Sequence, residues 1–183
     1  VYTFLSEHRH PEYDRPFKEL IFQPMLELID YLQANDFKVF IVTGGELSFV
    51  RTVSEEIYNI PQENVVGSNI LFQYESDSTG VEIIRTGKIV SANDKQIKPA
   101  NIELHIGKKP IFAAGNSDGD YEMMEYTLSG DGPSMAILVH HDDEEREYSY
   151  THGTEKAIED SPGKGWYVVS MKNDWKRVFS FEE

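Results

Sequence analysis

The feature that most constrains the fold is a set of short apolar runs that do not alternate with polar residues. They are KVFIV at 38–42, IFAA at 111–114 and MAILV at 135–139. A strand with one face in water alternates apolar and polar residues, whereas a strand covered on both faces is apolar throughout. Helical patterns separate these runs. The sequence therefore predicts an α/β protein whose mostly parallel sheet lies between two layers of helices.

Helical spacing is clearest in PMLELIDYLQAND, which starts at Pro24, and in residues 47–58. Further helices are expected at about 120–127 and near 155–159, with a strand in WYVVS at 166–170. Residues 1–20 are polar and are expected to be irregular. In 65–90 the runs NILFQYE and VEIIR flank SDSTG, which predicts a β-hairpin. Four large side chains are expected to pack in the core or at its edge: Met123, Met124, Trp166 and Trp175.

Composition limits the classes of function. The 183 residues suit one domain, and no apolar run is long enough to span a membrane. The net charge of −15 argues against unaided binding to nucleic acid or to an anionic membrane. The absence of cysteine excludes disulfides, thiolate metal sites and a cysteine nucleophile. Because the chain begins at Val1, we expect further residues to precede it. Both a cytoplasmic and a periplasmic or secreted location are open.

Three polar clusters follow the apolar runs. They are Thr43-Gly44-Gly45, GNSDGD at 115–120 and HHDD at 140–143. Ligands of α/β sheets bind beyond the carboxyl ends of the strands, so these clusters are expected along one rim. The alternatives are structural, because glycine, asparagine and aspartate also form turns and helix caps. The histidine and acidic residues at 140–145 could bind a metal, but such runs are usually solvated loops.

The chemistry of the clusters favours a phosphate and a hard cation. Thr43 supplies a hydroxyl, and Gly44 and Gly45 supply unhindered amides at the start of a helix, where anions bind. The carboxylates of 115–120 suit Mg²⁺, which prefers oxygen ligands. Lys98, in QIKPANI, precedes a short amphipathic segment and is the candidate cation, although a lysine is most often simply a surface residue.

The order of these clusters resembles motifs II, III and IV of the haloacid dehalogenase-like hydrolases. Thr43 in FIVTGG is similar to motif II, Lys98 to motif III, and GNSDGDYEMM to motif IV. The chain also resembles the phosphoserine-phosphatase-like subgroup in FQPMLELIDYL, IPQENVVGS, MKNDWKRVF and residues 130–148. The resemblance implies a Rossmann-like core over 21–183, with a remnant of a cap or linker at 1–20.

The resemblance implies a Mg²⁺-dependent phosphatase that acts through an aspartyl-phosphate on a small phosphorylated metabolite. Thr43 would bind the phosphoryl group together with Gly44, Gly45 and Lys98. Asn116 and Asp120 stand at the metal-binding positions of motif IV. Asn116 is a departure, because the family usually has an aspartate there, and Asp118 is therefore a further candidate metal ligand.

A second departure is larger, because the first motif of the family, Asp-x-Asp-x-Thr after an apolar strand, is absent from this sequence. We therefore expect the nucleophile and the central strand to come from upstream of Val1, from a second fragment or from a second chain. The 183 residues alone are expected to be inactive. Two alternatives stay open: a non-catalytic module that binds phosphate or metal, and an enzyme that transfers phosphate to an acceptor other than water.

Overall fold

The structure, a computed structural model, describes residues 1–182 and contains two three-stranded sheets. The first consists of β1 (Ile41–Glu46), β2 (Val65–Asp77) and β3 (Gly80–Ser91). In it, β1 and β2 are parallel, whereas β2 and β3 are antiparallel. The second consists of β4 (Phe112–Gly115), β5 (Met135–His140) and β6 (Tyr167–Ser170), all parallel. The predicted α/β class and its mostly parallel strands are confirmed.

Eight α-helices accompany the strands in the described residues. They are α1 (Tyr2–Glu7), α2 (Gln23–Ala34), α3 (Leu47–Arg51), α4 (Ser54–Tyr58), α5 (Ile97–Ile106), α6 (Tyr121–Leu128), α7 (Glu155–Lys164) and α8 (Met171–Asp174). None of these helices has both the length and the apolar character that crossing a membrane requires.

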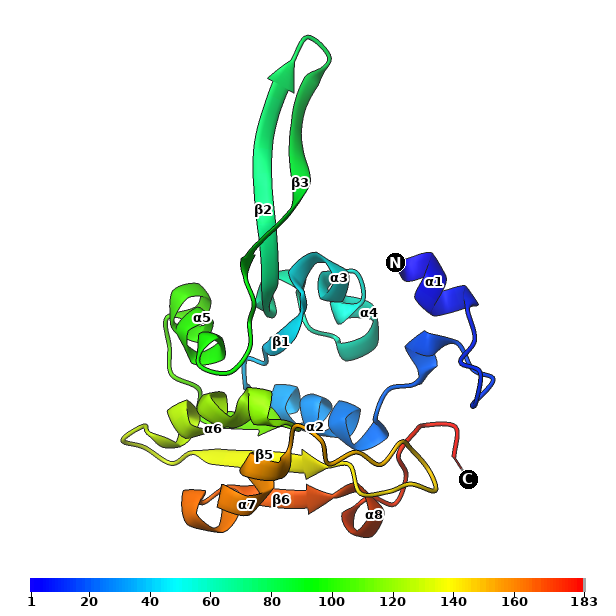
Figure 1. Cartoon of the computed structure of the whole chain (residues 1–183), viewed down its shortest axis with the longest axis vertical. Coiled ribbons are helices and arrows are strands. Elements are labelled where there is room, and N and C mark those ends of the chain that lie inside the picture. Colours follow the sequence, from blue (N-terminus) through cyan, green and yellow to red (C-terminus); the bar gives the residue numbers. More distant parts are fainter. Residues whose placement is uncertain (183) are drawn as a thin grey trace.

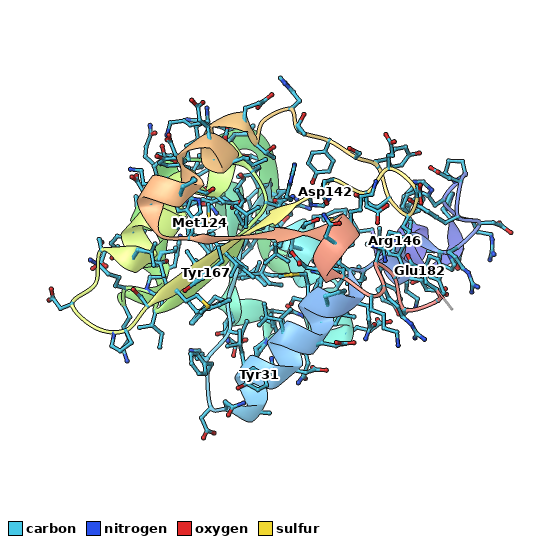
Figure 2. The ribbon with its side chains drawn as sticks, turned by 90° about the horizontal axis from the view of Figure 1, so that it is seen from below. Tyr31, Met124, Asp142, Arg146, Tyr167 and Glu182 are labelled. Atoms are coloured by element: carbon cyan, nitrogen blue, oxygen red, sulfur yellow. The ribbon has the colours of Figure 1, made fainter. Side chains whose placement is uncertain are left out.

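Neighbouring residues of β5 point into different clusters of buried side chains, because successive side chains of a strand face opposite sides. Leu138 packs with Met124 of α6 and Ala157 of α7. Val139 packs in the other cluster, against which Met25 of α2 lies. Helices α6 and α7 therefore cover one face of the second sheet and α2 the other, and Figure 2 shows α2 and α7 on opposite sides of it. Met123, Trp166 and Trp175 are also buried, as predicted.

The β2–β3 hairpin projects from the body of the molecule (Figure 1). Its two-residue turn is Ser78-Thr79, within the segment SDSTG where the sequence predicts a hairpin, and Asp77 Oδ1 accepts a hydrogen bond from the amide of Thr79 at 2.7 Å. Tyr74 lies opposite Ile83 on one face, and both are more than 60% exposed. The hairpin thus extends into solvent, where part of its apolar surface remains uncovered.

Three local predictions were wrong. Residues 1–20 contain α1 and a 3₁₀ turn at Phe17–Glu19, so they are not wholly irregular. The helix predicted over 47–58 is divided into α3 and α4, with Thr52 and Val53 between them. The first strand begins at Ile41 and continues through Thr43-Gly44-Gly45, rather than ending at residue 42. The proposed boundary between a cap remnant and a core at residue 20 remains a prediction.

Candidate phosphate and metal site

Lys98 joins the two sheets at the candidate site. It lies in the first turn of α5, and its Nζ donates to the main-chain oxygen of Val42 in β1 at 3.2 Å. The same Nζ is 2.5 Å from Oδ1 of Asp120, which lies just beyond the end of β4. The side chains of Lys98 and Asp120 are 8% and 7% exposed. A buried ion pair therefore connects the segments predicted as motifs II, III and IV.

Asp120 also organises the loop that follows β4. Its Oδ2 accepts hydrogen bonds from the amides of Asn116 and Ser117 at 3.0 and 3.3 Å, and from Ser117 Oγ at 3.3 Å. The loop then makes one 3₁₀ turn at Asp118–Asp120 and enters α6. Both oxygens of the Asp120 side chain are therefore occupied, Oδ1 by Lys98 and Oδ2 by the donors of the loop.

Gly115 and Gly119 are needed for close packing. Neither has a positive φ, so the loop does not exploit the left-handed conformations that favour glycine. A Cβ on Gly115 would collide with the side chain of Asp120, and one on Gly119 would collide with Asp94. The sequence predicts that these glycines allow a sharp turn. In the structure they instead leave room for the side chains of Asp120 and Asp94 to approach the backbone.

Asn116 and Asp118 turn to different neighbours. Asn116 Nδ2 donates to the hydroxyl of Tyr150 at 2.7 Å and lies 3.2 Å from Nε2 of His141. Asp118 Oδ1 accepts from the amide of Ala157 at 2.8 Å, so it caps the first turn of α7. The structure therefore brings Asn116 and Asp120 together through the main-chain N–H of Asn116, which donates to Asp120 Oδ2. The side chain of Asp118 instead contacts α7.

Thr43, Gly44 and Gly45 lie within β1 rather than at the start of a helix. Thr43 Oγ1 accepts a hydrogen bond from the amide of Gly45 at 3.0 Å. The main-chain oxygen of Gly44 accepts from Ser68 Oγ at 2.7 Å, and Glu46 caps α3 through Phe49 N at 2.9 Å. The Gly45 amide is therefore already used by Thr43, and the assignment of this segment to phosphate binding remains a prediction.

Two phosphoserine phosphatases, from Bos taurus and Homo sapiens, are each 27% identical to the chain over 92 residues, which are 50% of the chain and 40% of each relative. A solved phosphoserine phosphohydrolase-like protein from Francisella tularensis matches the fold with a TM-score of 0.52 and 20% identity. That match covers 81% of this chain and 58% of the other. Half of the chain is therefore similar in sequence to phosphoserine phosphatases, and its fold is similar to that of a phosphoserine phosphohydrolase-like protein. Comparison with models of protein families gives no match. The chain spans less than two thirds of the length of each of these relatives.

Asn93 is a further residue of the candidate site, and one that the sequence does not reveal. It is fully buried, and its Nδ2 donates to the main-chain oxygens of Thr43 at 2.9 Å and of Val66 at 3.4 Å. Its Oδ1 accepts from Nδ2 of Asn101 in α5 at 3.0 Å. Asn93 thus holds β1, β2 and α5 together beside Thr43. The only local signal is an Asn-Asp pair, which ordinarily indicates a turn.

The acidic segment after β5 is partly buried and contacts α8, so it is not the solvated loop that the sequence predicts. His141 and Asp143 are 2% and 3% exposed. Arg146 Nε lies 2.5 Å from Oδ2 of Asp143, and Nη2 of the same guanidinium donates to the main-chain oxygen of Met171 at 2.8 Å. Burial of Asp143 opposes its charge, but the hydrogen bonds from Arg146 hold the pKa of the carboxyl below its ordinary value.

The side chains at the candidate site could supply only some of the ligands that Mg²⁺ requires. Within residues 1–182 no group of three or more histidine and acidic side chains could hold a metal ion. Asp120 already receives Lys98 and the loop donors, whereas Oδ1 of Asn116 makes no hydrogen bond to the described residues. One carboxylate and one amide oxygen suit a Mg²⁺ site that takes its other ligands from phosphate, water and further protein groups.

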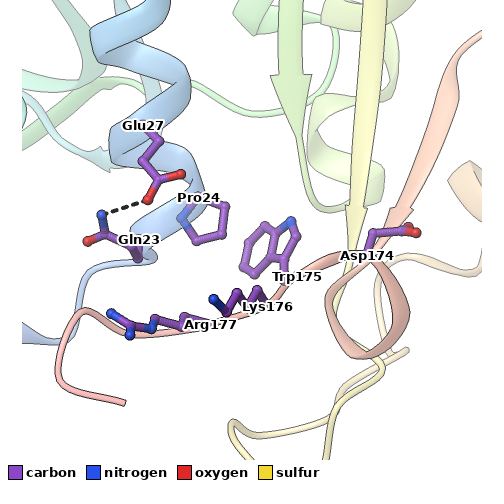
Figure 3. Close-up of a pocket in the computed structure, with 7 residues that line it drawn as sticks. All are labelled: Gln23, Pro24, Glu27, Asp174, Trp175, Lys176 and Arg177. Carbon is purple, nitrogen blue, oxygen red and sulfur yellow. Dashed lines mark hydrogen bonds between the residues drawn. The ribbon is translucent and has the colours of Figure 1, made fainter. Parts of the chain in front are cut away.

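A cavity of about 520 Å³ lies away from these residues (Figure 3). It is formed where the start of α2 meets the segment after α8, and Trp175 and Pro24 line it. Its remaining lining residues are Gln23, Glu27, Asp174, Lys176 and Arg177. None of them belongs to the candidate site, so the cavity gives no support to the predicted phosphate position.

Proposed function

We propose that the protein hydrolyses phosphomonoesters of a small metabolite, with Mg²⁺ as cofactor and an aspartyl-phosphate as intermediate. The observation that carries the proposal is the buried contact of Lys98 with Asp120 and with Val42. It joins three sequence segments whose order matches the motifs of haloacid dehalogenase-like phosphatases. The similarity to phosphoserine phosphatases supports the same class of reaction.

In the proposed reaction a carboxylate attacks phosphorus, the alcohol leaves, and water then cleaves the acyl phosphate. Lys98 would balance the negative charge of the nucleophile and of the transferred phosphoryl group. The Thr43 hydroxyl and the amide of Gly44 would donate to the phosphoryl oxygens, and the amide of Gly45 would do so in exchange for its hydrogen bond to Thr43 Oγ1. Asn116 and Asp120 would hold Mg²⁺, which neutralises charge on the phosphoryl oxygens when it is bound. A chain with a net charge of −15 needs such cations beside a phosphate.

We further propose that the nucleophile belongs to a strand outside these 183 residues, either in the same polypeptide or in a second one. Two observations support this. The sequence lacks Asp-x-Asp-x-Thr, and both β1 and β4 are edge strands of their sheets. Edge strands offer unpaired main-chain groups to an added strand. A strand between them would end beside Lys98, where a nucleophilic aspartate is required.

The test compares the 183-residue chain with the protein extended by its upstream residues, using p-nitrophenyl phosphate and O-phosphoserine in the presence of Mg²⁺. The chain alone is expected to show no turnover, and the extended protein is expected to hydrolyse at least one ester. Asp120→Asn in the extended protein should reduce turnover by about 10–100-fold. Turnover by the chain alone would contradict an external nucleophile, and full activity of Asp120→Asn would contradict the assignment of motif IV.

A second function is favoured by one residue, because Asn116 offers a neutral amide oxygen where the resemblance leads us to expect a carboxylate. A protein that only binds phosphate or a metal could function with this weaker ligand. Calorimetric titration of the extended protein with inorganic phosphate and Mg²⁺ separates the two functions. Binding without hydrolysis of either ester favours the binding module. Release of alcohol without inorganic phosphate, in the presence of a second alcohol, identifies a phosphotransferase.

A further inference from the structure

The side-chain nitrogen of Asn116 is held by two neighbours. Nδ2 donates to the hydroxyl of Tyr150 at 2.7 Å and lies 3.2 Å from Nε2 of His141. A primary amide has two N–H groups on its nitrogen, so these two neighbours use its full donor capacity. Oδ1 is the atom of the amide that they leave without a partner.

Glu147 determines which nitrogen of His141 can accept. Its Oε2 lies 3.1 Å from Nδ1 of His141, and the two side chains are 12% and 2% exposed. A carboxylate only accepts hydrogen bonds, so Nδ1 is the donor in this contact, and in the neutral ring Nε2 then presents its lone pair. That lone pair suits an N–H of Asn116. The opposite orientation of the amide would place its oxygen against another acceptor.

The imidazole is also fixed by packing. The ring of His141 stacks on Tyr150 with a centroid distance of 4.3 Å and an interplanar angle of 25°. Phe22 approaches the ring edge-on at 5.4 Å. The amide of Tyr150 donates to the main-chain oxygen of His141 at 3.1 Å. Phe22, Glu147 and Tyr150 therefore limit the rotation of the His141 ring. The fixed ring in turn limits the rotation of the Asn116 side chain.

We propose that Glu147, His141 and Tyr150 are positioning residues that orient Asn116 so that it presents an oxygen, and not an N–H group, to the candidate site. The inference rests on the proposed function for its purpose, because an oxygen at this point takes a hydrated divalent cation and does not bind a phosphoryl oxygen directly. The fixed orientation compensates in part for the missing carboxylate, since an amide free to rotate would have to be ordered with its oxygen toward the cation when the cation binds.

The orientation is measured first without metal or substrate. Nitrogen-15 NMR of the extended protein should show His141 protonated at Nδ1 and not at Nε2. The side-chain N–H groups of Asn116 should exchange with water at least 10-fold more slowly than those of Gln73, which is exposed on the β2–β3 hairpin. Protonation at Nε2, or fast exchange of the Asn116 amide, overturns the proposal whatever the protein catalyses.

The variants test whether positioning affects cation binding. Glu147→Leu removes the acceptor for Nδ1, whereas Glu147→Gln keeps an acceptor oxygen, and Glu144→Leu is the matched control on an exposed position of the same segment. Calorimetric titration of the extended protein with Mg²⁺ alone should give affinity about 10–100-fold weaker for Glu147→Leu. Glu147→Gln should recover most of that affinity, and Glu144→Leu should match the parent protein.

The two proposals fail in different ways. If the extended protein hydrolyses no ester but the NMR results and the order of Mg²⁺ affinities are as expected, the proposed function is wrong and the positioning stands. If the protein is an active phosphatase whose Mg²⁺ affinity is equal in the parent and Glu147→Leu, the positioning is wrong and the function stands. A Glu147→Leu variant that does not fold leaves the NMR of the parent protein to decide.

Discussion

The buried pair of Lys98 and Asp120 should be one of the main polar contributions to stability. In Asp120→Asn the shape of the side chain is kept and its charge is removed. Lys98, whose side chain is 8% exposed, would retain the main-chain oxygen of Val42 but lose its counter-ion. Removing one partner of a buried pair destabilises a protein by about 3–5 kcal/mol, because the remaining charge is left buried without compensation.

Lys98→Met should cost less, by about 1 kcal/mol or more. Asp120 would still accept from the amides of Asn116 and Ser117, and each hydrogen bond to a charged group contributes about 1.5–3 kcal/mol. In the double variant both charges are absent. The loss should therefore be smaller than the sum of the two single losses, with a coupling of about 0.5–3 kcal/mol.

The assay is urea unfolding of the 183-residue chain, followed by the fluorescence of Trp166 and Trp175, which are 5% and 8% exposed. The exposed pair of Lys164 and Glu125 is the control, because its side chains are 38% and 40% exposed. Lys164→Met should change the free energy of unfolding by less than about 1 kcal/mol. The reasoning is refuted if Asp120→Asn costs no more than Lys164→Met, or if the losses at 98 and 120 are additive.

Two further predictions concern packing and pH. Gly115→Ala should destabilise by about 1–3 kcal/mol because its methyl group would meet the side chain of Asp120, whereas Gly132→Ala, which has open space around it, should change stability by less than about 0.5 kcal/mol; both are measured by urea unfolding. Asp143 has a folded-state pKa below its ordinary value of 3.8, so its contribution is present above that pH and is lost as pH falls through the folded-state pKa. The stability difference between the parent and Asp143→Asn should therefore be largest at neutral pH and narrow below about pH 4; a difference independent of pH would contradict the role of Arg146.

Much of the fold could be predicted because its signals are local. The apolar run of β5 and the helical spacing of α2 depend on neighbouring residues alone, and both elements form close to where they are expected. The hairpin turn at Ser78-Thr79 is equally local. Element ends are less predictable. The break at Thr52 and Val53 interrupts an apolar pattern that continues through both helices, so periodicity alone does not reveal it.

The polar contacts at the site depend on residues distant in the sequence. The order of the motifs predicts Lys98 and Asp120 as residues of the site, and the structure brings them together. His141 was expected in a solvated loop because its neighbours are acidic. Its burial instead follows from Phe22, which is more than one hundred residues away and packs against its ring. No pattern within the acidic segment carries that information.

Helix α5 explains why the centre of the site is hard to recognise from hydrophobic periodicity. Its buried residues are Lys98, Asn101 and Ile102, which share one face because they are separated by three and four positions. Lys98 reaches β1 and Asp120, Asn101 reaches Asn93, and Ile102 packs in the same apolar cluster as Met124. Two of these three buried residues are polar. Hydrophobic periodicity therefore does not identify this face of α5 as part of the core. In α5 the lysine lies four positions before a buried apolar residue, Ile102, and is itself buried. The partner of such a buried lysine is an acidic residue near the end of a neighbouring strand, as Asp120 is here.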